Sequence, residues 1–349
     1  MKKILLFSFL VVSCVFGDAQ MPLKIDIINV VWGKNFTECF LKISLPLQLC
    51  AGNIGSLPPG MGRYRIFTTR DDWETMQSYP SMKKLQEMIE VDWVEIGYGS
   101  SDPYPLMNAC HRRAIKEAYE ENRALIFLCP DCLISNQTFQ TFFKNMREGK
   151  RMVATMALRT KKEIMVPLIE EILKEDNVWQ NGITSRHLVK LSMPYLHPMI
   201  EALFINNKQI HAVPTQIHWK LDSENVLGYG LHLHPLYIWP ETNAEYSGAI
   251  DNDFIFFACP TEEKWKLIQD SDEICVFEFS SSSWNSDILW MESHPYNVAR
   301  WAKEKAYPHH WFFFNRPIYI HASDYRQEWK VIEDQASAFI QEVKAYAGR

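Results

Sequence analysis

The chain has few of the features that define several common protein classes. Only 14 of its 349 residues are glycine, and it contains no internal repeat or low-complexity segment. With 47% hydrophobic and 22% charged residues it is neither collagenous nor disordered. Basic residues are not in excess, because 36 Lys and Arg stand against 42 Asp and Glu. With a net charge of −6, the sequence does not favour a nucleic acid as partner.

Signature motifs of several enzyme classes are also absent. The sequence has no Gly-x-Ser-x-Gly elbow, no Walker loop, no Gly-x-Gly-x-x-Gly fingerprint and no His-Glu-x-x-His pair. These absences argue against a serine hydrolase, a P-loop ATPase, a dehydrogenase and a zinc protease.

The cysteines are scattered along the chain. A chain of this length buries a core without disulfide bonds, and a thiol in an apolar segment packs as a small hydrophobic group. We therefore predict that most of them are reduced core residues. Apart from Cys14 they are Cys39, Cys50, Cys110, Cys129, Cys132, Cys259 and Cys275.

The N-terminus allows two interpretations. Lys2 and Lys3 precede an apolar run from Ile4 to Phe16, and small residues follow, as in a signal peptide. The sequence before Cys14 also resembles a lipoprotein box. On this interpretation residues 1–20 are a leader that exports the protein or anchors it to a membrane. Alternatively, translation starts at Met21 and the protein is cytoplasmic.

The pattern of the first half predicts alternating strands and helices. Several strands are apolar on both faces, which is typical of a mostly parallel sheet covered on two sides. The fold class predicted is therefore α/β, with a mostly parallel central sheet flanked by helices. The strands are expected at 24–32, 64–69, 91–96, 124–128 and 152–157, and the helices at 36–49, 82–89, 106–121 and 137–147.

After residue 161 the pattern is more irregular. The segment 280–326 is rich in Trp, His, Pro and Tyr without a clear period. We expect one domain over 22–327, in halves 22–160 and 161–327, with a mixed α/β C-terminal half and a final helix over 328–349. Within the second half, helices are expected at 163–175 and 188–203, and strands at 215–221, 228–233, 254–258 and 274–279.

The motif Cys129-Pro130-Asp131-Cys132 follows an apolar strand. In an open α/β sheet ligands bind beyond the carboxyl ends of the strands, so the motif is well placed for function. Cys-x-x-Cys between a strand and a helix is typical of thiol oxidoreductases. The next helix starts only near Ser135, however, which leaves an inert pair of buried cysteines as the alternative. A second hypothesis assigns the function to Asp131.

The segment from Asn108 through Asp131 carries a resemblance. A helix with Arg112 and Arg113 precedes an apolar strand that ends in Pro130-Asp131, which resembles the donor-binding half of GT-A-fold glycosyltransferases over roughly residues 25–157. In that family an Asp-x-Asp motif holds a divalent cation on the diphosphate of a nucleotide sugar. The resemblance implies Mn²⁺ or Mg²⁺ at Asp131. A single carboxylate stands here, so Asp131 has later co-ligands, the donor binds without metal, or Asp131 only caps a turn.

The same resemblance implies further donor contacts. Trp32 ends the first strand, where the family contacts the nucleobase, and Thr69 ends the second strand nearby. Arg112 and Arg113 are candidates for the phosphates, because a guanidinium binds them bidentately. A solvated helix face is the alternative for both arginines.

A second cluster contains His232, His234, Asp251 and Asp253. On a strand, residues two apart face the same side, so the two histidines are expected to converge. The family often supplies a late histidine to the metal and a carboxylate as base for the acceptor hydroxyl. The resemblance thus implies His234 as a metal ligand and Asp251 or Asp253 as the base, although a hydrogen-bonded structural histidine is also common.

Together these patterns favour a glycosyltransferase that uses a nucleotide-sugar donor and a glycan or lipid-linked acceptor, with 22–160 as the donor half and 161–327 as the acceptor half. The alternative is a non-catalytic carbohydrate- or nucleotide-binding protein on a degenerate transferase fold. A thiol oxidoreductase is the third hypothesis.

Overall fold

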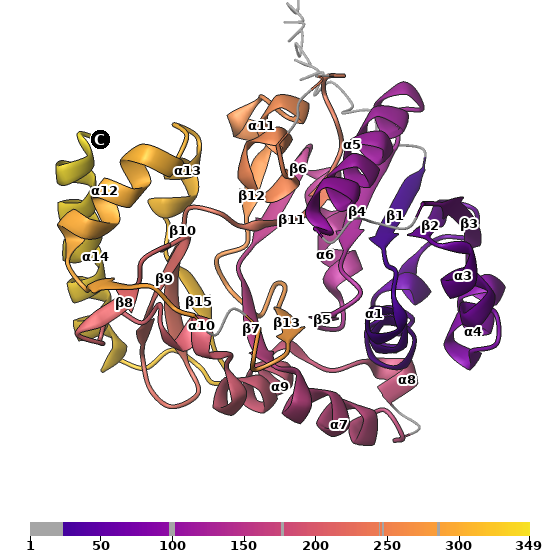
Figure 1. The fold of residues 1–349 in the computed structure, drawn as a ribbon, viewed down its shortest axis with the longest axis horizontal. Coiled ribbons are helices and arrows are strands. Elements are labelled where there is room, and N and C mark those ends of the chain that lie inside the picture. Colours follow the sequence, from indigo (N-terminus) through magenta and orange to yellow (C-terminus); the bar gives the residue numbers. More distant parts are fainter. Residues whose placement is uncertain (1–23, 98–101, 176–177, 244, 246–247, 285–286) are drawn as a thin grey trace, which may run out of the picture.

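A seven-stranded sheet forms the centre of the computed structural model, which describes residues 24–349 except 98–101, 176–177, 244, 246–247 and 285–286. Its strands lie in the order β12 (Trp265–Leu267), β6 (Met152–Thr155), β11 (His234–Ile238), β4 (Ala124–Leu128), β1 (Ile25–Val30), β2 (Gly62–Thr68) and β3 (Glu90–Glu95). β11 is antiparallel to its neighbours β4 and β6, and the other pairs are parallel. The predicted α/β class with a mostly parallel central sheet is confirmed (Figure 1).

The central strands are buried on both faces because successive apolar side chains point to opposite sides. In β1, Ile27 joins the hydrophobic cluster on one face and Ile28 the cluster on the other, and in β4 the same holds for Ile126 and Phe127. Full burial of one such side chain contributes roughly 1.5–3 kcal/mol. The apolar residues of the strands therefore stabilise the sheet.

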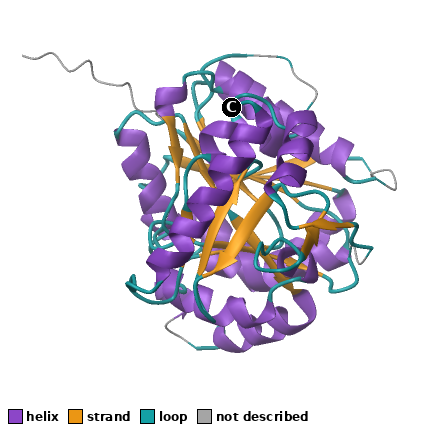
Figure 2. Ribbon diagram, turned by 90° about the vertical axis from the view of Figure 1, so that its left-hand side faces the viewer, coloured by secondary structure: helices purple, strands orange, loops and turns teal. Residues whose placement is uncertain are grey.

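Helices cover both faces of this sheet (Figure 2). One cluster includes Cys110 and Ala114 from the fifth helix, and the other includes Phe139 and Phe142 from the sixth. The helices of the first half are α1 (Lys34–Cys39), η1 (Phe40–Ser44), α2 (Leu45–Gln48), η2 (Ile54–Ser56), α3 (Arg70–Met76), α4 (Pro80–Met88), α5 (Tyr104–Glu120) and α6 (Thr138–Arg147).

Two places in the first half are helical although the sequence there disfavours a regular helix. Pro46 stands in the first turn of α2, directly after the π-helical turn η1, and the chain stays helical across it. Residues 70–72 begin α3, and the Thr69 side chain caps that helix by accepting from the Asp72 N–H.

A small sheet lies against the carboxyl edge of the central one, and of its strands only the one expected at 274–279 was predicted. It consists of β5 (Cys132–Ile134), β13 (Val276–Ser280) and β7 (Ala157–Lys161). β13 pairs antiparallel with β5 and parallel with β7. This sheet brings a segment from the second half of the chain onto the loop that follows β4.

The second half builds a third hydrophobic cluster around the sheet β15 (Ile318–Ile320), β10 (Val226–Gly230) and β9 (Gln216–Lys220). α12 (Pro295–Lys305), α13 (His310–Phe314) and α14 (Trp329–Ala347) pack there, and Figure 1 shows α12 and α14 far from α3 and α4. The other elements are α7 (Lys162–Ile172), α8 (Val178–Asn181), α9 (Ser185–Ser192), η3 (Met193–Tyr195), α10 (Pro198–Glu201), β8 (Gln209–His211), η4 (Ile250–Phe254), α11 (Ile255–Ala258), η5 (Glu262–Lys264) and β14 (Trp290–Glu292).

Two predictions for this half are wrong. The strand expected at 254–258 is the helix α11, because a short apolar run does not by itself distinguish a strand from a buried helical turn. The helix expected at 188–203 is divided into α9, η3 and α10, with Pro194 and Pro198 in the first turns of the last two. The final helix is confirmed as α14.

Three further points concern the ends and the thiols. The leader predicted over 1–20 lies outside the described residues. None of the helices within the described ranges is both long and apolar enough to cross a bilayer. All seven described cysteines are free, and all but the half-buried Cys129 are buried, which confirms the prediction of reduced core thiols.

Candidate functional site

The loop after β4 is held from three sides. The Cys132 N–H donates to the Cys129 carbonyl (3.2 Å) and closes a tight turn. The Ser44 hydroxyl donates to the Pro130 carbonyl (2.8 Å), and the Phe279 N–H from β13 donates to the Asp131 carbonyl (3.0 Å). These bonds fix the backbone of the Cys-Pro-Asp-Cys motif at the carboxyl edge of the sheet.

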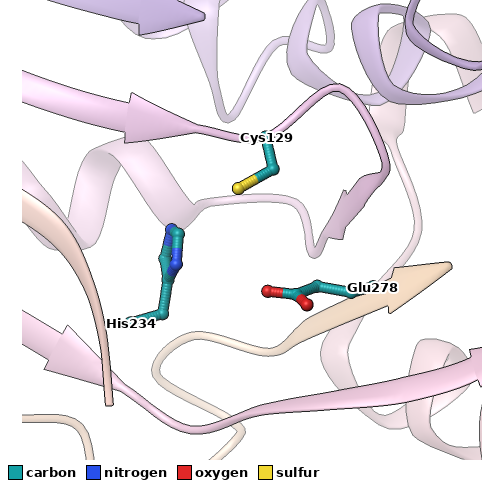
Figure 3. A group of neighbouring side chains, drawn as sticks. All are labelled: Cys129, His234 and Glu278. Carbon is teal, nitrogen blue, oxygen red and sulfur yellow. The ribbon is translucent and has the colours of Figure 1, made fainter. Parts of the chain in front are cut away.

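Three potential ligand groups meet at this loop (Figure 3). The Cys129 Sγ, an imidazole nitrogen of His234 and a carboxylate oxygen of Glu278 all lie within 4.8 Å of one another. They come from the end of β4, the start of β11 and the middle of β13. Cys129 also forms a second such group with Asp131 and Cys132. Asp131 and His234, both predicted metal ligands, thus each have a ligand atom within 4.8 Å of the Cys129 Sγ.

The charges at this site are not evenly matched. Arg159 on β7 pairs with Glu278 (Nη2 to Oε2, 2.9 Å) and donates to the Ser280 hydroxyl (3.0 Å). Burial and then the repulsion of Glu278 raise the pKa of Asp131 to about 7, although Arg159 acts in the opposite direction. Arg159 pairs directly with Glu278, and its charge and that of Lys162 act on Asp131 only partly against the repulsion from Glu278.

The predicted base residues lie in η4. Asp251 is exposed on η4; neighbouring groups that displace part of its water raise the pKa of its carboxyl, and the charges of His234, Glu278 and Arg159 also act on it. Asp251 is therefore part of the same electrostatic environment as Asp131. The side chain of Asp253 lies outside the described part of the structure.

α5 presents polar groups to this edge. His111 is buried, and its ring meets the Phe127 ring edge-on at 5.2 Å. Burial lowers its pKa to about 3, and the charges of His234 and Arg112 act in the same direction. Within the described residues, the Nδ1 of His111 and the Oδ1 of Asn108 have no hydrogen-bond partner. Buried polar atoms without a partner are typical of places where water or a ligand binds.

The other predicted donor residues lie in different surroundings. Trp32 is half-buried just after β1. The Thr69 hydroxyl donates to the Asp72 carboxylate (2.7 Å), which also accepts from the Gly33 N–H (2.8 Å). Arg113 is exposed and donates to Glu117 (2.7 Å), so its guanidinium belongs to a charge network further along the sheet.

The expected convergence of His232 with His234 is not found, because β11 begins only at His234. The His232 ring instead lies 4.7 Å from the His310 ring and 5.9 Å from the Trp301 ring. The rule that residues two apart on a strand face the same side therefore does not apply to His232.

Sequence reasoning missed three residues of the site. Glu278 is the one charged residue in the strand Val276–Ser280, between two phenylalanines, and this pattern was a usable signal. Arg159 lies in β7, which the sequence did not predict. His111 stands on an otherwise apolar helix face, where a buried histidine is unexpected.

The geometry does not favour the redox hypothesis. α6 begins at Thr138, so no helix N-terminus faces the two thiols. Although a hydrogen bond with Cys132 favours the Cys129 thiolate, burial raises the pKa of the Cys129 thiol. The pKa of Cys132 is raised by that hydrogen bond and by burial. Reactive thiols have lowered values.

A separate open cleft of about 380 Å³ lies between β14 and α12. Two indole rings line it, and Trp290 is 52% exposed. Asn297, Arg300 and Glu304 lie on the same face of α12, three and four residues apart. In the described part of the chain, Arg300 and Glu304 have no ion-pair partner. The cleft is lined by Ala212, Trp290, Met291, Asn297, Arg300, Trp301 and Glu304.

Fold and site together describe a mixed α/β protein with a mostly parallel central sheet and flanking helices, whose candidate site lies at the carboxyl edge of that sheet. No protein-family model matches the chain, and no curated protein sequence matches it. Among solved structures the chain is similar to the apo form of mouse xyloside xylosyltransferase 1, with a TM-score of 0.26 and 9% identity over 45% of this chain. The similarity spans 61% of the mouse chain, less than two thirds of its length. The function proposed below therefore rests on the residues of the site.

Proposed function

We propose that the protein is a glycosyltransferase of the GT-A type that binds a nucleotide sugar at the carboxyl edge of the central sheet. One observation carries the proposal: potential ligand atoms of Asp131, His234 and Glu278 lie within 4.8 Å of the Cys129 Sγ there, and Arg159 pairs with Glu278, so that four separate segments meet. The strand order β3-β2-β1-β4 is that of a mononucleotide-binding half, in which ligands bind at this edge. Carboxyl groups with raised pKa values in such a position are candidates for function.

The residues have distinct tasks in this proposal. Arg159 and Arg112 bind the diphosphate, because guanidinium groups pair with phosphate oxygens. Trp32 and Thr69 stand at the ends of β1 and β2, where the nucleoside binds. Asp131 and His234 hold a divalent cation, which would neutralise the diphosphate as the sugar departs. Asp251 accepts the proton of the acceptor hydroxyl, with Asp253 next in line as base.

The acceptor is proposed to be a glycan that occupies the cleft between β14 and α12. Indole faces pack against the C–H faces of sugar rings, and planar amide, guanidinium and carboxylate groups pair with adjacent hydroxyls. Trp290 and Trp301 supply the first kind of contact, and Asn297, Arg300 and Glu304 the second. The Trp301 ring lies 5.9 Å from the ring of His232, which stands two residues before His234 in the chain.

The test is a thermal-shift series with UDP-, GDP- and CMP-sugars, each with and without Mn²⁺. We expect one nucleotide to raise the Tm of the wild type and to have a much smaller effect on Asp131→Asn. Exposed Asp287→Asn serves as a matched control and should respond like the wild type. Stabilisation by none of the nucleotides would contradict the proposal, and binding without transfer or hydrolysis would point to a non-catalytic sugar- or nucleotide-binding protein.

A further inference from the structure

The three side chains of Figure 3 offer three different ligand atoms: sulfur, nitrogen and oxygen. Mg²⁺ prefers oxygen ligands alone, whereas thiolate and imidazole favour zinc and related transition metals. We propose that Cys129, His234 and Glu278 form a zinc-class metal site with one open coordination position. This inference names the class of cation at the proposed donor site and adds Cys129 and Glu278 to its ligands; it rests on the proposed function only in assigning the open position to the donor diphosphate, with Asp131 beside it.

The geometry fits such a site because each ligand is fixed by its surroundings. The turn at Cys132 and the bond from Ser44 hold Cys129 in place. The His234 Nε2 lies 3.5 Å from the Phe127 carbonyl, and Glu278 pairs with Arg159 at 2.9 Å. Partners behind the ligands orient them and tune the metal. Three protein ligands with a fourth position left open are typical of catalytic rather than structural zinc.

A divalent ion bound with the Cys129 thiolate would add one net positive charge next to the Glu278 carboxylate, whose oxygen lies within 4.8 Å of the Cys129 Sγ. The ion would lie next to Asp131, which shares Cys129 as neighbour.

Another group of potential metal ligands is already paired with the protein's own side chains and backbone. Asp270, Asp272 and His321 also lie close together, but Arg186 already pairs with Asp272 (2.8 Å). Both ring nitrogens of His321 are occupied, by Asp270 and by the Ser323 carbonyl, each at 2.8 Å. The protein's own groups thus satisfy that cluster, and it needs no ion.

Co²⁺ titration of the chelator-treated, full-length protein tests the site without nucleotide. A cobalt–thiolate bond gives a charge-transfer band in the near ultraviolet that oxygen and nitrogen ligands do not give. The wild type should show this band, and Zn²⁺ should abolish it. Cys129→Ser should lack the band, whereas Cys132→Ser and the remote control Cys259→Ser should keep it. In the control, the serine can still donate to the carbonyls that the Cys259 thiol contacts.

A second measurement covers the case in which Cys129→Ser does not fold. In a competition with a chromophoric chelator, His234→Asn should weaken Zn²⁺ binding by about tenfold or more, judged from the effect of disturbing metal sites. A cobalt band that persists in Cys129→Ser, or Zn²⁺ binding that His234→Asn does not change, would overturn the inference. Nucleotide binding without a cobalt band contradicts this inference alone, and a cobalt band without nucleotide binding contradicts the donor site alone.

Discussion

The two ends of the central sheet differ in how completely their charged side chains are paired. At the amino end, Asp26 is 1% exposed and accepts from Arg63 (2.7 Å) and from Arg123 (2.8 Å). Arg65 next to it pairs with Asp92 (2.9 Å) and with Glu117 on α5 (2.6 Å). Each acidic group there has a cation in contact, so the network supports the fold.

At the carboxyl end, several charged and polar side chains lack a complete set of partners. Arg159 pairs directly with Glu278, and the pKa of Asp131 is raised. Buried atoms of His111 and Asn108 have no hydrogen-bond partner in the described structure. Such groups cost stability, and proteins keep them chiefly where they serve a function. The comparison therefore separates residues that stabilise the sheet from residues that act on a ligand.

The largest expected effect is at the amino end. Asp26→Asn removes the buried charge between Arg63 and Arg123 and leaves both guanidinium groups with only the half-exposed Glu121 carboxylate, at 3.6 and 3.7 Å. Breaking a buried ion pair in this way costs about 3–5 kcal/mol. Urea unfolding should show this loss, while Glu121→Gln, whose carboxylate is 49% exposed, should cost about 1 kcal/mol or less. Equal losses in the two variants would contradict the assignment.

Asp131→Asn should lower activity without lowering stability. Loss of the carboxylate removes a contact to the donor's cation worth several kcal/mol in the transition state. At ~1.4 kcal/mol for each tenfold change, transfer or donor hydrolysis should fall about a hundredfold or more. The urea midpoint should not fall. A variant that unfolds would show that Asp131 is a structural cap, and full activity would exclude it from the donor site.

A smaller effect is expected in the cleft between β14 and α12. Trp290→Ala removes an exposed ring, so the fold should be unaffected. Loss of one stacking contact of about 1.4 kcal/mol would raise the KM for a glycan acceptor about tenfold, with little change in the KM for the donor. The control Tyr119→Ala, 41% exposed on α5, should change neither value. An unchanged acceptor KM in Trp290→Ala would place the acceptor elsewhere.

The smallest effect is a pH dependence. Because the pKa of its carboxyl is about 7 in the folded protein and 3.8 in a free side chain, Asp131 gives stability below pH 4 that is lost as the pH rises to 7. Asp131→Asn removes this loss. With chelator present, its Tm relative to the wild type should be higher at pH 8 than at pH 4, by about 2 °C or more. An equal difference at both pH values would contradict the raised pKa.

The sequence could predict features that depend on a local pattern, but not those that depend on how distant strands pair. Apolar periodicity identified the strands that are buried on both faces, since each carries its own pattern. Asp131 was found because it follows such a strand. The ion pair between Asp26 and Arg63 depends on the register of β1 with β2, which no local pattern shows.

Two site residues were not predicted for a similar reason, because they depend on strand pairing. Glu278 reaches Cys129 only because β13 pairs with β5, which has three residues and no periodicity of its own. Arg159 depends on β7 in the same sheet. Contacts between short strands far apart in the sequence follow from tertiary packing, and these contacts complete the site.

The most direct test of the account compares Arg159 at the carboxyl edge with Arg113 on α5, whose partner Glu117 also pairs with Arg65 of the amino-end network. The Kd of UDP or GDP, whichever stabilises the wild type, is measured by calorimetry for Arg159→Gln and Arg113→Gln. Loss of one charged phosphate contact, about 1.5–3 kcal/mol, predicts a Kd at least about tenfold weaker for Arg159→Gln. Arg113→Gln, which loses only its pair with Glu117, should bind like the wild type. Weaker binding in Arg113→Gln with unchanged binding in Arg159→Gln would contradict the donor site at the carboxyl edge.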